Sequence, residues 1–188
     1  NSTNGRAVLL AFNISNGALL QRVDTLAGSS STPNGLAPAE GVDVDRDGDM
    51  DFFYAGDLLG NLWKFDLGNS SATQWRVAFG TTTAPLPFFT ARNASSQVQP
   101  ITGGVSLGFN PADRKLWVFF GTGRYLATSD LPIVETQSWY GLIDDGINCQ
   151  GCVAVCTNAA HCDTCNNIDE DCDGKIDEDF APTACGPS

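Results

Sequence analysis

An acidic loop at residues 43–51 lies between β-prone segments and limits the architectures open to this chain. Positions 1, 3, 5, 7 and 9 of the loop are Asp43, Asp45, Asp47, Asp49 and Asp51. With Gly48 at position 6, alternate side chains and the position-7 carbonyl of Asp49 converge on an oxygen-liking cation. Position 12 is Tyr54, not the glutamate of a helix–loop–helix EF-hand. The spacing therefore predicts a structural calcium site between β-strands.

Two alternatives to calcium exist for this loop. One is a solvated acidic surface turn, because a bare Asp-x-Asp-x-Asp pattern recurs by chance in acidic proteins. However, the five carboxylates repel one another, and Arg46 is the only basic residue among them. The other alternative is magnesium, which prefers fewer protein ligands and strict octahedral geometry. The glycine at position 6 and the aspartate at position 9 favour calcium.

A second loop with the same spacing lies at residues 169–177. Its positions 1, 3, 5, 7 and 9 are Asp169, Asp171, Asp173, Lys175 and Asp177. Gly174 again takes position 6, and Lys175 stands where a backbone carbonyl is contributed. Cys172 lies inside this loop and is expected to crosslink it. The two loops together predict one or two bound calcium ions.

The cysteines divide the chain into two parts. All seven follow residue 148: Cys149, Cys152, Cys156, Cys162, Cys165, Cys172 and Cys185. We therefore expect a cysteine-free domain at 1–148 and a tail at 149–188 that is too small to bury its own core. The two Cys-x-x-Cys pairs, which start at Cys149 and Cys162, also fit a zinc site of four thiolates. Disulfides are favoured in a secreted chain, although an odd count leaves one thiol over.

Short β-prone runs separated by turn signals predict an all-β fold, since helical periodicity is nearly absent. Strands are expected at residues 6–12, 18–23, 51–55, 61–65, 75–79, 105–109, 115–121 and 139–143, and linkers at 27–40 and 80–100. The hairpin spacing is typical of a β-propeller with about three blades of roughly 40–50 residues, and a β-sandwich is the competing fold. Three blades do not close a ring. Other copies of the chain, or a partner, are then expected to cover the open strand edges.

Charge and composition exclude several functions. The net charge of −12 leaves no basic footprint for nucleic acid, and no apolar run is long enough to span a membrane. The single histidine, His161, removes the usual Ser–His and Cys–His schemes, so we do not expect an enzyme. Abundant Gly, Ser, Thr and Asn with scarce Lys, Met and His are typical of a secreted β protein.

Several conspicuous side chains have two interpretations each. The tryptophans are either core between blades or ligand-stacking platforms: Trp63, Trp75, Trp117 and Trp139. Asp57 and Arg124 are either surface hydrogen-bonding residues or members of a network between blades. The sequence leaves both alternatives open.

Three segments carry a family resemblance. They are VDVDRDGDMDFFYAGDLLGNLWKFDL (residues 42–67), LWVFFGTGRYL (116–126) and QSWYGLID (137–144). In order and spacing they resemble the C-terminal β-propeller of PilY/PilC-type proteins, the type IV pilus tip-associated adhesins and assembly factors. The resemblance implies that the acidic loop binds calcium and that its occupancy is tied to pilus extension, retraction and surface adhesion. It also implies pilin or minor pilin subunits as partners, and an extracellular, cell-surface or pilus location.

The tail resembles a second group of proteins. Its segment CNNIDEDCDG (residues 165–174) is similar to the C-N-x-x-D-x-D-C-D-G metal-binding repeat of MopE-like surface proteins.

Together, the two loops and the two resemblances predict a calcium-binding, pilus-associated extracellular protein in adhesion or type IV pilus assembly. One alternative is a structural subunit or decorating piece of an extracellular filament. Another is a lectin-like, calcium-dependent binding module.

Overall fold

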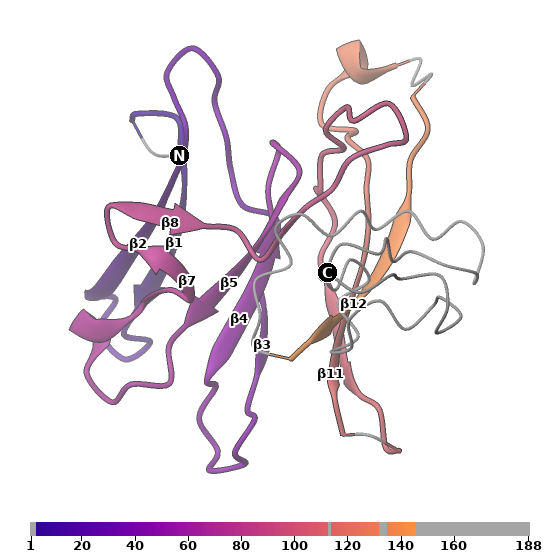
Figure 1. Cartoon of the computed structure of the whole chain (residues 1–188). Coiled ribbons are helices and arrows are strands. Elements are labelled where there is room, and N and C mark those ends of the chain that lie inside the picture. The colour runs from indigo at the N-terminus through magenta and orange to yellow at the C-terminus, as the bar shows by residue number, and fades with distance from the viewer. Residues whose placement is uncertain (1–2, 113, 132–134, 146–188) are drawn as a thin grey trace, which may run out of the picture.

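The computed structural model describes residues 3–112, 114–131 and 135–145 (Figure 1). These residues contain twelve short β-strands and two 3-10 helical turns, joined by loops. The predicted all-β character is confirmed in this part of the chain. The elements are β1 (Arg6–Phe12), β2 (Leu19–Gly28), β3 (Glu40–Val42), β4 (Phe52–Gly56), β5 (Asn61–Asp66), η1 (Ala72–Gln74), β6 (Arg76–Val77), β7 (Phe79–Thr81), β8 (Ala84–Leu86), β9 (Phe89–Thr90), β10 (Ser106–Phe109), β11 (Leu116–Gly121), η2 (Thr128–Asp130) and β12 (Trp139–Asp144).

The strands form three sheets that lie side by side, with a small extra hairpin (Figure 1). The first sheet is the β1–β2 hairpin, and the last sheet has the order β10–β11–β12. Between them lies the middle sheet, β3–β4–β5–β6, with β9 added to β5. The extra hairpin is β7–β8, and every strand pairing is antiparallel. The sheets do not close into a ring within the described residues.

The middle sheet is buried on both faces, which explains the near-continuous apolar sequence of β5. Because side chains alternate along a strand, Leu62 packs toward the last sheet while Trp63 and Phe65 pack toward the β1–β2 hairpin. In β4, Tyr54 and Ala55 divide between the two faces in the same way. One strand pair therefore supplies both hydrophobic cores of the stack.

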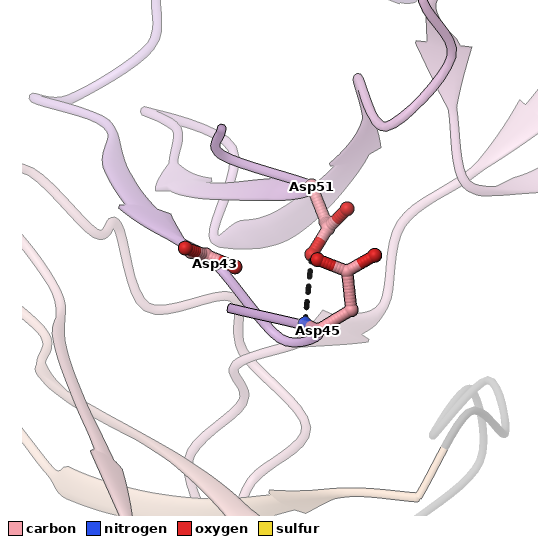
Figure 2. A group of neighbouring side chains, drawn as sticks. All are labelled: Asp43, Asp45 and Asp51. Atoms are coloured by element: carbon pink, nitrogen blue, oxygen red, sulfur yellow. Dashed lines mark hydrogen bonds between the residues drawn. The ribbon is translucent and has the colours of Figure 1, made fainter. Parts of the chain in front are cut away.

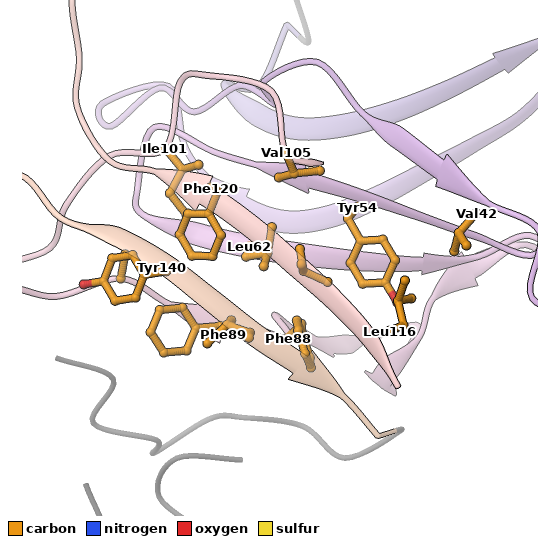
Figure 3. Close-up of a cluster of buried hydrophobic side chains, with 13 residues drawn as sticks. Val42, Tyr54, Leu62, Phe88, Phe89, Ile101, Val105, Leu116, Phe120 and Tyr140 are labelled. Carbon is orange, nitrogen blue, oxygen red and sulfur yellow. The ribbon is translucent and has the colours of Figure 1, made fainter. Parts of the chain in front are cut away.

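The larger core lies between the middle and last sheets (Figure 3). The ring centroid of Tyr140 on β12 lies 5.2 Å from that of Phe89 and 5.0 Å from that of Phe120. Phe88 stacks on Phe79 with a centroid separation of 6.0 Å. Both Phe88 and Phe89 belong to the segment 80–100, so the prediction of a linker there was wrong. The many turn-forming residues of this segment suggested a linker, whereas its two adjacent phenylalanines are buried in the core.

Two further expectations about the strands need correction. Residues 75–79 do not form one strand: β6 has only Arg76 and Val77, and Phe79 begins a separate strand, β7. The blades are also not uniformly four-stranded: the first sheet has two strands, the middle five and the last three. A propeller blade usually has four strands, a number that only the middle sheet reaches within the described part of the chain.

A buried ion pair joins the middle sheet to the last strand. Lys64 Nζ on β5 contacts Asp144 Oδ2 on β12, and Tyr54 donates its hydroxyl proton to the same oxygen. Burial, and then the charge of Asp144, raise the pKa of Tyr54, which keeps the hydroxyl protonated as a donor. Lys64 Nζ also lies 4.2 Å from the ring centroid of Phe52. No sequence signal marked this pair, because its two members are far apart in the chain.

Candidate metal centre

The acidic loop connects two paired strands of the middle sheet. β3 ends at Val42 and β4 begins at Phe52, and these two residues pair at the base of the loop. The backbone N–H of Asp51 donates to the Val42 carbonyl at 2.9 Å. The N–H of Leu67, just after β5, donates to the Asp51 carbonyl at 2.8 Å. Asp51 is therefore held by the backbone on both sides.

Three aspartates of the loop converge (Figure 2). One carboxylate oxygen from each of Asp43, Asp45 and Asp51 lies within 4.8 Å of the other two. Asp43 and Asp51 are half-buried, whereas Asp45 is exposed. These three residues, the aspartate trio, come from positions 1, 3 and 9 of the loop.

Backbone N–H groups orient the trio. Asp51 Oδ2 accepts from the Val44 N–H at 2.7 Å, and Asp43 Oδ2 accepts from the Gly48 N–H at 3.0 Å. The turn needs left-handed backbone at two residues, Arg46 with φ 66° and Gly48 with φ 102°. A glycine adopts this conformation without the steric cost of a Cβ atom. Gly48 therefore permits the sharp turn of the loop.

The donor set of the trio suits a hard cation. Carboxylate oxygens are the ligands that calcium prefers, and a hairpin loop can wrap them around one ion. Among the described residues, no lysine or arginine forms an ion pair with any of the three. Within the described part of the chain, neutral backbone N–H groups donate to these carboxylates. A calcium ion at this position would be held by Asp43, Asp45 and Asp51.

Asp47 and Asp49 lie outside the trio. Asp47 Oδ1 accepts a hydrogen bond from the N–H of Asp49 at 2.9 Å. Both residues line a groove of about 560 Å³ that runs beside the loop, between β1 and the middle sheet, and Asp51 of the trio lines it too. The structure thus brings together three of the four predicted side-chain ligands. Sequence reasoning did not predict this groove, which is called the β1 groove below.

The tryptophans have different surroundings. Trp63 is buried between the first and middle sheets, and Trp75 is half-buried against the same core. On the outer face of the last sheet, Trp117, Phe119 and Trp139 form a row of nearly parallel rings with centroids 5.8 and 5.4 Å apart. Trp139 is 71% exposed. Core packing therefore accounts for Trp63, but not for this outer row.

Asp57 and Arg124 also separate. Arg124 is exposed and forms an ion pair with Asp130 at 2.9 Å. Asp57 is fully buried, and its carboxylate accepts five hydrogen bonds. The donors are the Asn34 side chain, the Leu59 N–H, the N–H and side chain of Asn61, and the indole of Trp63. Asp57 therefore belongs to an internal network, and Arg124 to the surface.

The second loop at 169–177 and all seven cysteines lie outside the described residues, so the predictions about them stay predictions. Across the residues that are described, no helix is both long enough and apolar enough to cross a membrane.

Comparisons with known proteins identify the family. The chain matches the family model of the PilY1 beta-propeller domain over residues 1–184. A type IV pilus biogenesis factor PilY1 homolog from Xylella fastidiosa (strain Temecula1) is 38% identical over 155 residues, covering 78% of this chain and 10% of that protein. The type IV pilus biogenesis factor PilY1 of Pseudomonas aeruginosa (strain PAO1) is 33% identical over 161 residues, covering 76% and 13%.

A solved structure supports the same assignment. The crystal structure of the Pseudomonas aeruginosa PilY1 C-terminal domain is 31% identical, with a TM-score of 0.68 over 79% of this chain and 33% of that chain. The chain therefore belongs to the PilY1 β-propeller domain family, as its sequence resemblance predicted. It spans about a tenth of the length of the curated relatives it matches.

Proposed function

We propose that this chain is the calcium-binding β-propeller portion of an extracellular, pilus-associated protein that acts in adhesion, in type IV pilus assembly or in both. Its relatives are named type IV pilus biogenesis factors, which supports a role in that process with pilin or minor pilin subunits as partners. The convergence of three carboxylates in a β-hairpin loop is the observation that carries the calcium part. The cation would act structurally, and we propose no catalytic step.

Calcium at the trio would stabilise one end of the middle sheet. The loop joins β3 to β4, and Asp51 is tied to the end of β5 through the Leu67 N–H. A cation bound only by the folded loop stabilises the folded state by mass action. Because the middle sheet supplies both cores, loss of order in this loop would destabilise the packing of all three sheets. The surface available to partners would then be less well ordered.

Calcium titration by calorimetry tests the proposal. The metal-free chain should bind one ion at the trio, and a second if the loop at 169–177 also binds. Asp51→Asn should remove one site, whereas Asp66→Asn, which alters a partly exposed ion pair with Arg76, should leave the count unchanged. Asp171→Asn then assigns the second site. Absence of calcium binding by the folded wild-type chain would overturn the calcium part of the proposal.

The tail is proposed to be held by disulfides. Mass spectrometry of the unreduced chain should show a loss of two hydrogen atoms for each disulfide formed by the seven cysteines. Seven free thiols with one bound zinc would instead establish the thiolate site.

The position of the protein on the pilus separates the main proposal from its first alternative. Gold-tagged antibody should label filament tips if the chain belongs to an adhesin or assembly factor. Regular labelling along the shaft would make it a structural subunit or a decorating piece of the filament.

The outer aromatic row favours a second candidate function, glycan binding. The rings of Trp117, Phe119 and Trp139 are nearly parallel, and an added Cβ at Gly141 would lie only 3.0 Å from Phe119. Phe119 therefore lies against the glycine, and flat ring faces of this kind suit the apolar faces of sugars. A glycan array should then show binding that Trp139→Ala removes and that Phe109→Ala, an exposed aromatic elsewhere, does not. An array without binding would exclude this candidate.

A further inference from the structure

A lysine and an aspartate lie in contact beside the larger core. Lys64 Nζ on β5 is 2.5 Å from Asp144 Oδ2 on β12, and the two side chains are only 8% and 3% exposed. Tyr54, which pairs with Lys64 across β4 and β5, donates its hydroxyl to the same carboxylate oxygen. The packing of the middle sheet on the last sheet therefore brings an amine, a carboxyl group and a phenol together, away from water.

Aromatic rings surround the amine. Lys64 Nζ lies 4.2 Å from the ring centroid of Phe52, and 5.8 Å from those of Tyr54 and Phe79. Two buried charges lose their hydration, and their mutual attraction need not repay that cost in full. Transfer of one proton from the amine to the carboxylate removes both charges, so this neutral pair is more accessible here than in water. A neutral lysine amine is a nucleophile.

The cation of this pair is unlike those of the other ion pairs among the described residues. Lys64 is largely buried, whereas the four other pairs use arginine side chains that are between 39% and 54% exposed. An arginine guanidinium stays protonated, while a desolvated lysine amine can act as a nucleophile. The residue type that is able to react thus occupies the site from which water is excluded.

We propose that Lys64 and Asp144 condense to an intramolecular isopeptide bond, which joins the middle and last sheets covalently. The amine attacks the carboxyl carbon, so the Nζ–Cγ bond forms, the Cγ–Oδ2 bond breaks, and the oxygen leaves as water. Starting from the ion pair, two protons of Nζ leave with that oxygen. The reaction therefore needs no oxidant, reductant or other co-reactant. Tyr54 donates its hydroxyl proton to the departing oxygen and regains a proton that the amine releases.

The fixed placement of the two groups favours this condensation. The Lys64 carbonyl accepts from the Ala78 N–H at 2.9 Å, and Asp144 pairs with Leu116 on β11. Groups held in a productive orientation react with effective molarities of about 10⁵–10⁸ M. The product amide also replaces two buried charges with a neutral group. The proposal goes beyond the proposed function, because it requires neither a cation nor a pilus partner.

Mass spectrometry of the full chain tests the proposal. The folded protein is unfolded in denaturant with a reducing agent, so that no disulfide contributes to its mass. It should then be lighter than its sequence by one water molecule. Trypsin should no longer cleave after Lys64, and it should release residues 47–76 joined to the peptide that contains Asp144.

Two variants assign the loss of water. Lys64→Arg keeps a positive charge but lacks the amine nucleophile, so it should have the full mass of its sequence. Arg76→Lys is the matched control, because it places a lysine beside Asp66 at a partly exposed pair. That variant should lose the one water of the unaltered chain and no second one. The branched peptide keeps the test decisive even if Lys64→Arg fails to fold.

A third variant tests the phenol. Tyr54→Phe keeps the ring but lacks the hydroxyl that contacts the departing oxygen. Chain purified from inclusion bodies in denaturant is folded, and its mass is followed with time. Loss of water should be at least about tenfold slower in Tyr54→Phe than in the unaltered chain, the effect of losing a proton donor. Equal rates would overturn the part assigned to Tyr54.

Two results would overturn the isopeptide bond itself. One is the full sequence mass in folded wild-type chain after prolonged incubation. The other is a loss of water that persists in Lys64→Arg, because a succinimide at an Asp–Gly step such as Asp47–Gly48 removes the same mass. Calcium binding by a chain of full mass would remove this inference and leave the proposed function standing.

Discussion

Strand β4 has an aspartate next to each end, and the two differ in burial and in the groups around them. After the strand, Asp57 is fully buried and accepts five hydrogen bonds from neutral donors. Before the strand, Asp51 joins Asp43 and Asp45 in a partly exposed group whose oxygens lie within 4.8 Å of one another. The carboxylate after the strand is thus satisfied by hydrogen bonds within the protein, whereas the one before it belongs to a cluster of like charges.

The difference shows what each end requires. A buried carboxylate is stable when enough donors replace its hydration, and Asp57 has them. Three carboxylates in one loop cannot be satisfied that way, because N–H donors orient them without cancelling their charge. We therefore expect Asp57 to stabilise the fold whether or not cations or salt are present. The trio should instead respond to cations and to salt.

The largest expected effect is at Asp57. Asp57→Ala leaves the buried Trp63 indole and the Asn34 and Asn61 amides without their acceptor, so it should lower the free energy of unfolding by about 3–5 kcal/mol. Urea unfolding should give the same loss with calcium and with chelator. Asp66→Ala, at the partly exposed pair with Arg76, should cost no more than about 1 kcal/mol. A loss that disappears in chelator would contradict the contrast between the two ends.

Calcium removal should have the next largest effect. At a calcium concentration 100 times the dissociation constant, binding at the trio stabilises the fold by about 2.7 kcal/mol. Chelation should therefore lower the melting temperature by roughly 5–10 °C for a domain of this size.

Variants show whether that shift comes from the trio. The calcium-dependent shift should be lost in Asp51→Asn, because Asp51 is one of the three converging residues. It should be largely retained in Asp47→Asn, because Asp47 lies outside that group. Loss of the shift in Asp47→Asn alone would restore Asp47 as the essential ligand and contradict the geometry of the trio.

Local patterns predicted much of the fold. The Asp-rich spacing and its glycine placed the loop between two strands, and β1 was predicted with its observed bounds, Arg6–Phe12. These features depend on neighbours within a few residues, where backbone preference and side-chain alternation act directly. The same short range explains why the loop register indicated Asp43, Asp45 and Asp51 together.

Contacts between distant segments were not predictable in this way. Lys64 meets Asp144 only because the middle and last sheets pack together. Phe88 and Phe89 lie in a segment rich in turn-forming residues, so their burial emerges only in the assembled core. The register likewise did not show that Asp47 lies outside the trio and lines the β1 groove. Such features follow from how sheets meet, and one sequence does not encode that as a local pattern.

A glycine substitution tests whether the shape of the loop matters as much as its charges. Gly48 has φ 102°, and an added Cβ would meet no atom within 4 Å, so Gly48→Ala introduces backbone strain without a clash. It should cost about 1–2 kcal/mol and weaken calcium binding. Gly103→Ala is the control, because Gly103 also has open space but no left-handed φ. Equal melting temperatures of the two variants would mean that the turn at Gly48 relaxes easily.

The smallest expected effect is that of salt on the calcium-free protein. Between about 0.01 and 1 M ionic strength the screening length falls from about 30 to about 3 Å, which relieves repulsion within the trio. In chelator, sodium chloride should therefore stabilise the wild-type chain by a few tenths of a kcal/mol, the scale of exposed charge pairs. Asp51→Asn removes one of the three charges, so its melting temperature should rise less over the same range. Asp57 is already satisfied by neutral donors, so salt should not change the cost of Asp57→Ala. An equal rise in wild type and Asp51→Asn would mean that salt does not act through the trio, and the two ends of β4 would then differ in burial alone.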